Sequence, residues 1–212
     1  MDLKTAQRYA DKICTWLEPY ALRLGVAGSI RRQRPFCADI DIVCIPKITA
    51  DQDLLGAQTD RTNLCLGFLQ RYVQMNQRPP VDPQSPQDPA TSLASPRFLS
   101  GGEREGKQVI LQLPKCQLDL WFADESTWAT RMLCRTGSKE HNIWLCTRAN
   151  ERGFHWDPYT GLRTLSQRSD PDQVYPAGNE RDIYNYLGLE FIEPKNRELE
   201  WLTKHIDSGL LV

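Results

Sequence analysis

The sequence predicts an α+β fold, and three patterns support this prediction. Apolar side chains recur at a helical period from residue 3 to 18, where Asp2 is available as an N-cap. Asp39 and Asp41 alternate with Ile40 and Ile42, and apolar residues continue to Ile45, which predicts a strand from 39 to 45. Two further helices are expected from 126 to 135 and from 138 to 152. Helical and strand periods therefore occur in one chain.

Composition and charge are those of an ordinary globular protein of 212 residues, 40% hydrophobic and 25% charged. No apolar run approaches the roughly 20 residues of a membrane span, and the first residues lack the apolar stretch of a signal peptide. We expect an intracellular (cytoplasmic) protein that is monomeric and binds no membrane. The seven cysteines are odd in number and form no CxxC pair, so we expect reduced thiols.

Further elements are expected on both sides of a proline-rich stretch, residues 77 to 96. Because this stretch has hardly any apolar side chains to bury, it should be an extended surface insertion and not a domain boundary. Period-2 patterns and turn residues predict strands at 22–27, 97–100, 108–113 and 116–122, and a hairpin within 154–165. Helices are expected at 179–187 and, from apolar residues at helical spacing, at 60–75, where the helix would cover the sheet. Pro194 is expected to open a last turn.

Three aspartates are the clearest chemical signal. Asp39 and Asp41 would lie roughly 7 Å apart on one face of their strand, while the neighbouring isoleucines enter the core. Asp119 stands between leucines in another strand, where a charge is unfavourable unless it is paired or bound to metal. On neighbouring strands the three carboxylates would hold one or two divalent cations, and such oxygen ligands suit Mg²⁺ or Mn²⁺. From the pattern alone, exposed strand-end aspartates remain an equal alternative.

Two stretches could contact a phosphate or a nucleotide. Gly28 and Ser29 form a turn beside arginines, and exposed amides with a free hydroxyl can cradle a phosphate. Ser138 caps a helix whose unpaired amides can meet a ligand, and Asn142 lies one turn further on. The basic clusters are Arg31, Arg32 and Arg34, and Arg131, Arg135, Lys139, Arg148 and Arg152. Since the net charge is -1, nucleic-acid binding would depend on such clusters, which are more often solvated surface.

With these motifs in this order, the chain resembles the DNA polymerases of family X, the polymerase-beta-like nucleotidyltransferases. The resemblance rests on G-S-I-R-R at 28–32, D-I-D at 39–41, Q-L-D-L at 117–120 and T-G-S-K-E-H-N at 136–142. A weaker match is R-D-I-Y-N-Y-L-G-L-E-F-I-E-P-K-N-R-E at 181–198. Each motif is modest, but the ordered set is specific and spans nearly the whole chain.

The resemblance implies a nucleotidyltransferase palm, a mixed sheet with helices on one face, for residues 1 to 124, with 77 to 96 as its insertion. It implies a small, mostly helical, nucleotide-selecting subdomain for residues 125 to 212. It also implies a minimal member of the family, without the lyase and helix-hairpin-helix domains of the larger polymerases.

The implied activity is template-directed addition of nucleotides to a primer 3′-hydroxyl with two Mg²⁺ ions, or Mn²⁺ as a substitute, in gap-filling repair. Its partners would be primer–template or gapped DNA and dNTPs, with rNTPs as the alternative. Asp39 and Asp41 would bind both metals, and Asp119 would bind the catalytic metal and take the proton of the primer hydroxyl. The residues expected to bind the nucleotide are Gly28, Ser29, Arg32, Arg135, Gly137, Ser138 and Asn142.

One departure from the family concerns the sugar. Larger members have an aromatic pair just before the Thr136-Gly137 step, where this chain has Cys134 and Arg135. Two other functions therefore stay open. One is a transferase on the same palm that modifies RNA ends or proteins, or has relaxed sugar selectivity; the other is a binding module with an inactive site. Because the phosphate-turn residues and the three aspartates occur together, the inactive module is the least favoured.

Overall fold

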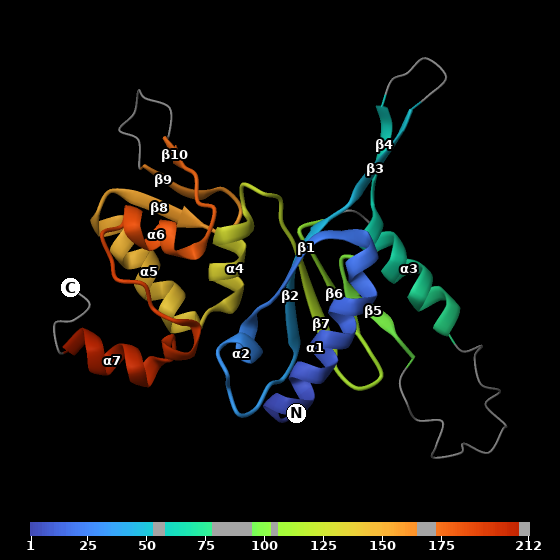
Figure 1. Ribbon diagram of the computed structural model, residues 1–212, viewed down its shortest axis with the longest axis horizontal. Helices are drawn as coiled ribbons and strands as arrows, with labels where there is room; N and C mark the ends of the chain where they lie inside the picture. The colour runs from blue at the N-terminus through green and yellow to red at the C-terminus, as the bar shows by residue number, and fades with distance from the viewer. Residues whose placement is uncertain (53–57, 78–94, 103–105, 165–172, 208–212) are drawn as a thin grey trace.

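A five-stranded sheet organises the amino-terminal part of the protein (Figure 1). In this computed structural model, the described residues are 1–52, 58–77, 95–102, 106–164 and 173–207. The strands are β1 (Ala21–Val26), β2 (Ile40–Pro46), β5 (Arg97–Ser100), β6 (Gln108–Gln112) and β7 (Gln117–Phe122). In the order β1-β2-β7-β6-β5, β2 and β7 run parallel and the other neighbours antiparallel, so the sheet is mixed.

Helices α1 (Leu3–Leu17) and α3 (Leu64–Asn76) cover one face of this sheet (Figure 1). Their apolar side chains share a core with inward-facing residues of the strands, such as Ile42 of β2. The start of α1 agrees with the sequence, because the Asp2 side chain accepts a hydrogen bond from the Thr5 amide at 2.9 Å. The helix therefore begins and buries its apolar stripe as its period predicts.

The opposite face of the sheet is partly covered by α4 (Trp128–Thr136). Val43 and Ile45 of β2 form a small second core there with Trp128 and Met132 of α4. Because side chains alternate along a strand, Asp41 belongs to this face and not to the face under α1. The strand thus has apolar residues on both faces, and an acidic residue at the edge of the second core.

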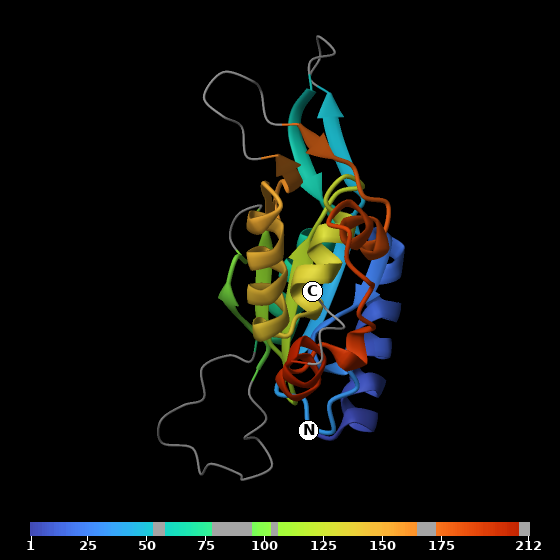
Figure 2. The ribbon, with the colours of Figure 1, turned by 90° about the vertical axis from the view of Figure 1, so that its left-hand side faces the viewer.

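The carboxy-terminal half contains a third core. Its elements are α5 (Lys139–Glu151), α6 (Glu180–Tyr186), α7 (Leu199–Asp207) and a small sheet of β8 (Phe154–Asp157), β9 (Gly161–Thr164) and β10 (Val174–Tyr175). Figure 2 views the molecule from the side on which α5 and α7 lie. The predicted fold class, α+β with a mixed sheet and a mostly helical part after it, is confirmed.

Two elements differ from the sequence prediction. The predicted helix from residue 60 begins only at Leu64, because Gln58–Asn63 is a strand, β4, that pairs with β3 (Ile48–Gln52) in a projecting hairpin (Figure 1). The Asn63 side chain caps the helix by accepting a hydrogen bond from the Leu66 amide at 3.1 Å. The second element is α7 (Leu199–Asp207), a helix that the sequence does not predict, since only a turn opened by Pro194 is expected there.

Most of the proline-rich insertion, residues 78–94, lies outside the described residues. No helix within the described ranges is long and apolar enough to cross a membrane. All seven cysteines are free thiols, as predicted.

Candidate active site

The parallel pair of β2 and β7 brings predicted aspartates together. In the strand register Asp41 lies opposite Asp119, and Asp39 stands just before β2 begins. Since neighbouring strands are about 4.8 Å apart, these carboxylates share one small region of the sheet. The negative charge of Asp39 acts on both Asp41 and Asp119, so the three groups repel one another.

The Asp41 carboxylate is unfavourably charged in these surroundings. Burial, followed by the charge of Asp39, raises the pKa of Asp41 to about 7, although Trp121 Nε1 donates a hydrogen bond to its Oδ1 at 3.2 Å. Burial also raises the pKa of Asp119, whose Oδ1 accepts a hydrogen bond from Gln117 Nε2 at 2.7 Å. Crowded carboxylates of this kind favour the approach of a cation or a proton.

The oxygen donors fit a divalent metal ion, but they do not form a finished cage. Within the described ranges, no three histidine, cysteine, aspartate or glutamate side chains are gathered closely enough to hold an ion. Mg²⁺ prefers carboxylate oxygens and usually keeps waters or substrate phosphates in its shell, so a partial protein cage is compatible with it. Metal binding by Asp39, Asp41 and Asp119 stays a prediction.

Gly28 and Ser29 open the one-turn helix α2 (Gly28–Arg31) beside Asp41. Gly28 has φ +58°, and a Cβ built there would lie 2.0 Å from Asp41 Oδ2, so only glycine leaves room for this carboxylate. The Ser29 hydroxyl oxygen is buried and has no hydrogen-bond partner among the described residues. It is therefore a polar group that a ligand could satisfy.

Gly28→Ala should lower the free energy of unfolding by about 2 kcal/mol or more, because a left-handed backbone is strained for alanine and the methyl group displaces Asp41. Chemical denaturation measures this loss. Gly67→Ala in α3 is the control: nothing lies within 4 Å of its added methyl, so it should stabilise the protein by about 0.5–1 kcal/mol. Equal stability of Gly28→Ala and wild type would contradict the close approach of the Asp41 carboxylate to Gly28.

The predicted phosphate ligand Arg32 is engaged with the protein itself. Its Nε donates a hydrogen bond to Glu198 Oε1 at 2.7 Å, and its Nη1 donates one to the carbonyl oxygen of Thr136. Gly137 lies against the same side chain, since a Cβ on Gly137 would be 3.3 Å from Arg32 Nη1. The structure therefore brings Arg32 and Gly137 together where α2 meets the end of α4.

Two other predicted nucleotide-binding residues, Ser138 and Asn142, make structural contacts in α5. Ser138 Oγ accepts a hydrogen bond from the His141 amide at 3.3 Å and is the N-cap of the helix. Asn142 Nδ2 donates to the carbonyl oxygen of Cys134 at 2.9 Å and so ties α5 to the end of α4. The sequence predicts the cap correctly but not the contact with Cys134.

Arg135 lies on the carboxylate side of α4. Its guanidinium carbon is 3.4 Å from the centroid of the Trp121 ring, and its charge acts on Asp41 and Asp119. Trp121 thus stacks with Arg135 while it donates its hydrogen bond to Asp41. The sequence motifs do not single out Trp121 or Gln117 as site residues, although both lie on the same strand face as Asp119.

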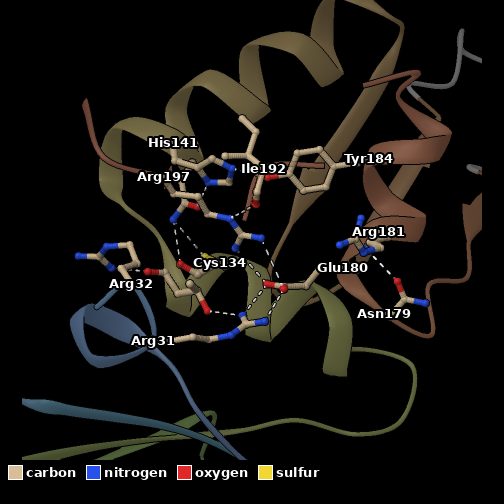
Figure 3. Close-up of polar contacts among 12 residues, drawn as sticks. Arg31, Arg32, Cys134, His141, Asn179, Glu180, Arg181, Tyr184, Ile192 and Arg197 are labelled. Carbon is tan, nitrogen blue, oxygen red and sulfur yellow. Dashed lines mark hydrogen bonds and ion pairs between the residues drawn. The ribbon is translucent and has the colours of Figure 1, made fainter. Parts of the chain in front are cut away.

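A buried ion-pair network joins α2 to the carboxy-terminal half (Figure 3). Glu180 accepts hydrogen bonds from Arg31 at 2.8 and 2.6 Å and from Arg197 at 3.1 Å. Burial opposes the charge of Glu180, but the hydrogen bonds from Arg31 and the charge of Arg197 hold its pKa below the usual range. Because these residues are far apart in the chain, no sequence pattern indicates the network.

His141 lies beside this network as a buried, neutral imidazole (Figure 3). Its Nε2 is 2.5 Å from the hydroxyl oxygen of Tyr184. Burial, and after it the charge of Arg197, lowers the pKa of His141 to about 3. Because an unfolded histidine titrates near 6.5, the folded state is favoured above that pH and loses this contribution as the pH falls from 6.5 toward 3.

The free energy of unfolding of wild type relative to His141→Gln should therefore fall by about 1 kcal/mol per pH unit as the pH is lowered from 6 to 4. Urea denaturation of both proteins at several pH values measures this difference. The raised pKa values of Asp41 and Asp119 act in the opposite direction, and they cancel because both proteins contain them. A difference in free energy of unfolding between the two proteins that does not change with pH would contradict the conclusion that His141 is neutral in the folded state.

Comparison with known proteins supports the class that the fold and the site indicate. Residues 131–198 match the family model of the DNA polymerase beta thumb. DNA polymerase IV of Saccharomyces cerevisiae is 33% identical to this chain over 69 residues, which are 32% of the chain and 11% of that relative. The matched part is thus about a tenth of the length of the yeast protein. Together with the mixed sheet, these matches support a polymerase-beta-like protein, as the resemblance in the sequence predicts.

Proposed function

We propose that the protein is a small family X-like DNA polymerase that adds nucleotides to a primer 3′-hydroxyl under the direction of a template. The observation that supports this most strongly is the cluster of Asp39, Asp41 and Asp119 beside the Gly28 turn. The cluster occurs in a chain whose residues 131–198 match a polymerase beta thumb. Carboxylates next to a phosphate turn are the groups that phosphoryl transfer from a nucleotide requires.

The proposed reaction is an in-line phosphoryl transfer. The primer 3′-oxygen attacks the α-phosphorus of a nucleoside triphosphate, a phosphodiester bond forms, and pyrophosphate leaves. Asp119 is proposed to take the hydroxyl proton, because burial raises its pKa and so makes it a better proton acceptor than an exposed carboxylate. Asp39 and Asp41 would hold Mg²⁺ or Mn²⁺ with it. When bound, such a metal would supply charge neutralisation for the phosphate oxygens.

The nucleotide would lie between α2 and the start of α5. Ser29 and Arg32 are proposed to hold its triphosphate, because the Ser29 hydroxyl is unpaired and a guanidinium can form two hydrogen bonds with a phosphate. Arg32 would exchange its hydrogen bond to Glu198 for one to the phosphate. Gly137, Ser138 and Asn142 are proposed to line the sugar and the base. The contact between Arg32 and Gly137 supports this, since it joins the two groups of residues.

In this proposal residues 1–124 are the palm and residues 125–212 select the nucleotide. The partners are primer–template or gapped DNA and dNTPs, and the biological role is gap filling.

A second candidate is a nucleotidyltransferase on the same palm that accepts rNTPs, RNA ends or proteins. It is favoured by one observation: Cys134 and Arg135 provide no aromatic ring to screen the sugar. Asn142 binds the Cys134 carbonyl, and Arg135 turns toward Trp121. The two candidates share the carboxylates, so the substrate distinguishes them.

Primer extension tests the proposal. Purified protein is incubated with gapped or primer–template DNA and labelled dNTPs or rNTPs, in Mg²⁺ or Mn²⁺. We expect template-dependent incorporation of dNTPs. Equal use of rNTPs, or transfer only to RNA or protein acceptors, would favour the second candidate, and no extension of any DNA by wild type would contradict the first.

A further inference from the structure

A groove with a volume of about 640 Å³ lies where the five-stranded sheet meets the carboxy-terminal half. The sheet contributes Ile45 at the end of β2 and Phe122 at the end of β7. Helix α4 contributes Arg131, and the turn between β8 and β9 contributes Tyr159. Because Ile45 is four residues from Asp41, which is about 13 Å along a strand, the groove is separate from the carboxylate cluster.

Two cations of this groove share one tyrosine ring. Lys107 Nζ lies 3.8 Å from the centroid of the Tyr159 ring, and the Arg131 guanidinium carbon lies 4.1 Å from it. Arg131 is only 5% exposed, and its Nε and Nη1 have no hydrogen-bond partner among the described residues. The face of the ring attracts both cations but does not replace the acceptor atoms that a buried guanidinium requires, so this arginine favours an added acceptor.

The groove also has two acidic residues, and neither of them pairs with these cations. Asp124 Oδ1 accepts hydrogen bonds from Ser126 Oγ at 2.6 Å and from the Thr127 amide at 2.9 Å, and Glu125 is exposed. Within the described ranges, no ion pair joins either carboxylate to Lys107 or Arg131. The charged lining is thus balanced as a whole, while the charge of the buried arginine is locally uncompensated.

This distribution of charge favours a ligand with a single carboxylate over a polyanion. A strand of nucleic acid carries a phosphate at every nucleotide, so its other phosphates would lie near Asp124 and Glu125, and a balanced lining offers no net attraction to it. A lone carboxylate would need only the two cations beside Tyr159. Apolar groups next to that carboxylate would match the rest of the lining, such as Ile45 and Phe122.

We propose that the groove binds a peptide segment of a partner protein in which an acidic side chain stands next to apolar ones. The carboxylate accepts charged hydrogen bonds from Arg131 and lies near Lys107, and the apolar neighbours pack on Ile45 and Phe122. Because the lining comes from β2 and β7 as well as from α4 and the β8–β9 turn, the bound segment joins the sheet to the carboxy-terminal half. This docking site does not depend on the proposed function.

Selection from a random peptide display library tests this proposal. Peptides are selected on the full chain, with Lys107→Gln as the counter-selection, and are then synthesised with a fluorophore. Each selected peptide is matched by a second one in which its acidic residue is replaced by the corresponding amide. We expect the selected sequences to combine an acidic residue with apolar neighbours. Fluorescence anisotropy should show binding about tenfold weaker or more for the amide peptide, for Lys107→Gln and for Arg131→Met, since each removes a charged partner.

Arg71→Gln, on the exposed surface of α3, is the matched control and should bind the peptides like wild type. Arg131 is buried, so its variant needs a check of folding by circular dichroism, whereas exposed Lys107 can be removed without that concern. Selection of no acidic peptide, or affinities that are unchanged in Lys107→Gln, would overturn the proposal. A single-stranded oligonucleotide in EDTA is the second probe: displacement of the peptides by it, with the same dependence on Lys107, would overturn the proposal in favour of a nucleic-acid surface.

Discussion

Asp119→Asn should slow primer extension by about a thousandfold or more, because it removes a proton acceptor and a metal-binding charge from the proposed site. Its folding should be preserved. Burial already disfavours the charge of Asp119, so a neutral amide of the same shape should give a free energy of unfolding equal to that of wild type or higher. The expected result is therefore a stable protein without activity, seen by primer extension and chemical denaturation on the same samples.

The matched control is Asp11→Asn on α1. Asp11 is an exposed carboxylate whose side-chain contact is a hydrogen bond from Gln7 Nε2 at 2.8 Å, so its neutralisation should leave extension within about twofold of wild type. Extension by the Asp119 variant at the wild-type rate would remove this carboxylate from the mechanism. A variant that is unstable as well as inactive would show that the side chain is structural.

Glu180→Gln should lower the free energy of unfolding by about 3–5 kcal/mol, the usual effect of breaking a buried ion pair by removal of one partner. Arg197 has an exposed fraction of 0% and Glu180 one of 7%. Without the carboxylate, the guanidinium of Arg197 is left buried with its charge uncompensated, and Arg31 loses its hydrogen bonds to Glu180. Guanidinium denaturation monitored by tryptophan fluorescence measures the change.

Glu193→Gln provides the comparison in the same part of the chain. Glu193 pairs with Arg181 at 2.8 Å, but both side chains are more than half exposed, so the change should be within about 1 kcal/mol. Similar losses of the free energy of unfolding in the two variants would mean that the buried Glu180 network adds no more stability than an exposed ion pair. A loss confined to Glu180→Gln would establish that this network holds α2 to the carboxy-terminal half.

The sequence predicts well those parts of the fold that local patterns determine. The start of α1 follows from Asp2 and an apolar stripe, and β2 follows from the alternation around Asp41. The pairing of β3 with β4 was missed because the polar residues 58–63 have no period that separates a strand from a helix start, and their strand form depends on a partner strand. The secondary structure of such segments is determined by pairing with a partner strand.

The candidate site likewise has features that local sequence patterns predict and contacts that they do not. The spacing of Asp39, Asp41 and Asp119 reveals carboxylates on strands, and the parallel pairing of β2 with β7 then sets two of them opposite each other. The partners of Arg32 could not be predicted, because a contact between residues 32 and 198 leaves no trace in local spacing. For that reason the sequence indicates which side chains could bind or react with a substrate, but not which of them already form hydrogen bonds within the protein.

Arg32 and Glu198 have a consequence for nucleotide binding. Glu198 lies 2.7 Å from Arg32 Nε and 3.6 Å from Arg34 Nη1, so its carboxylate stands where the triphosphate of the proposed substrate would form its hydrogen bonds. If Arg32 holds a phosphate as proposed, a phosphate that takes its Nε would have to displace Glu198, and the carboxylate would then be an internal competitor of the substrate. The apparent affinity for nucleotide is then the intrinsic affinity reduced by the fraction of molecules in which Glu198 has withdrawn. In the proposed function, the carboxy-terminal segment would thereby raise the nucleotide concentration needed to fill the site.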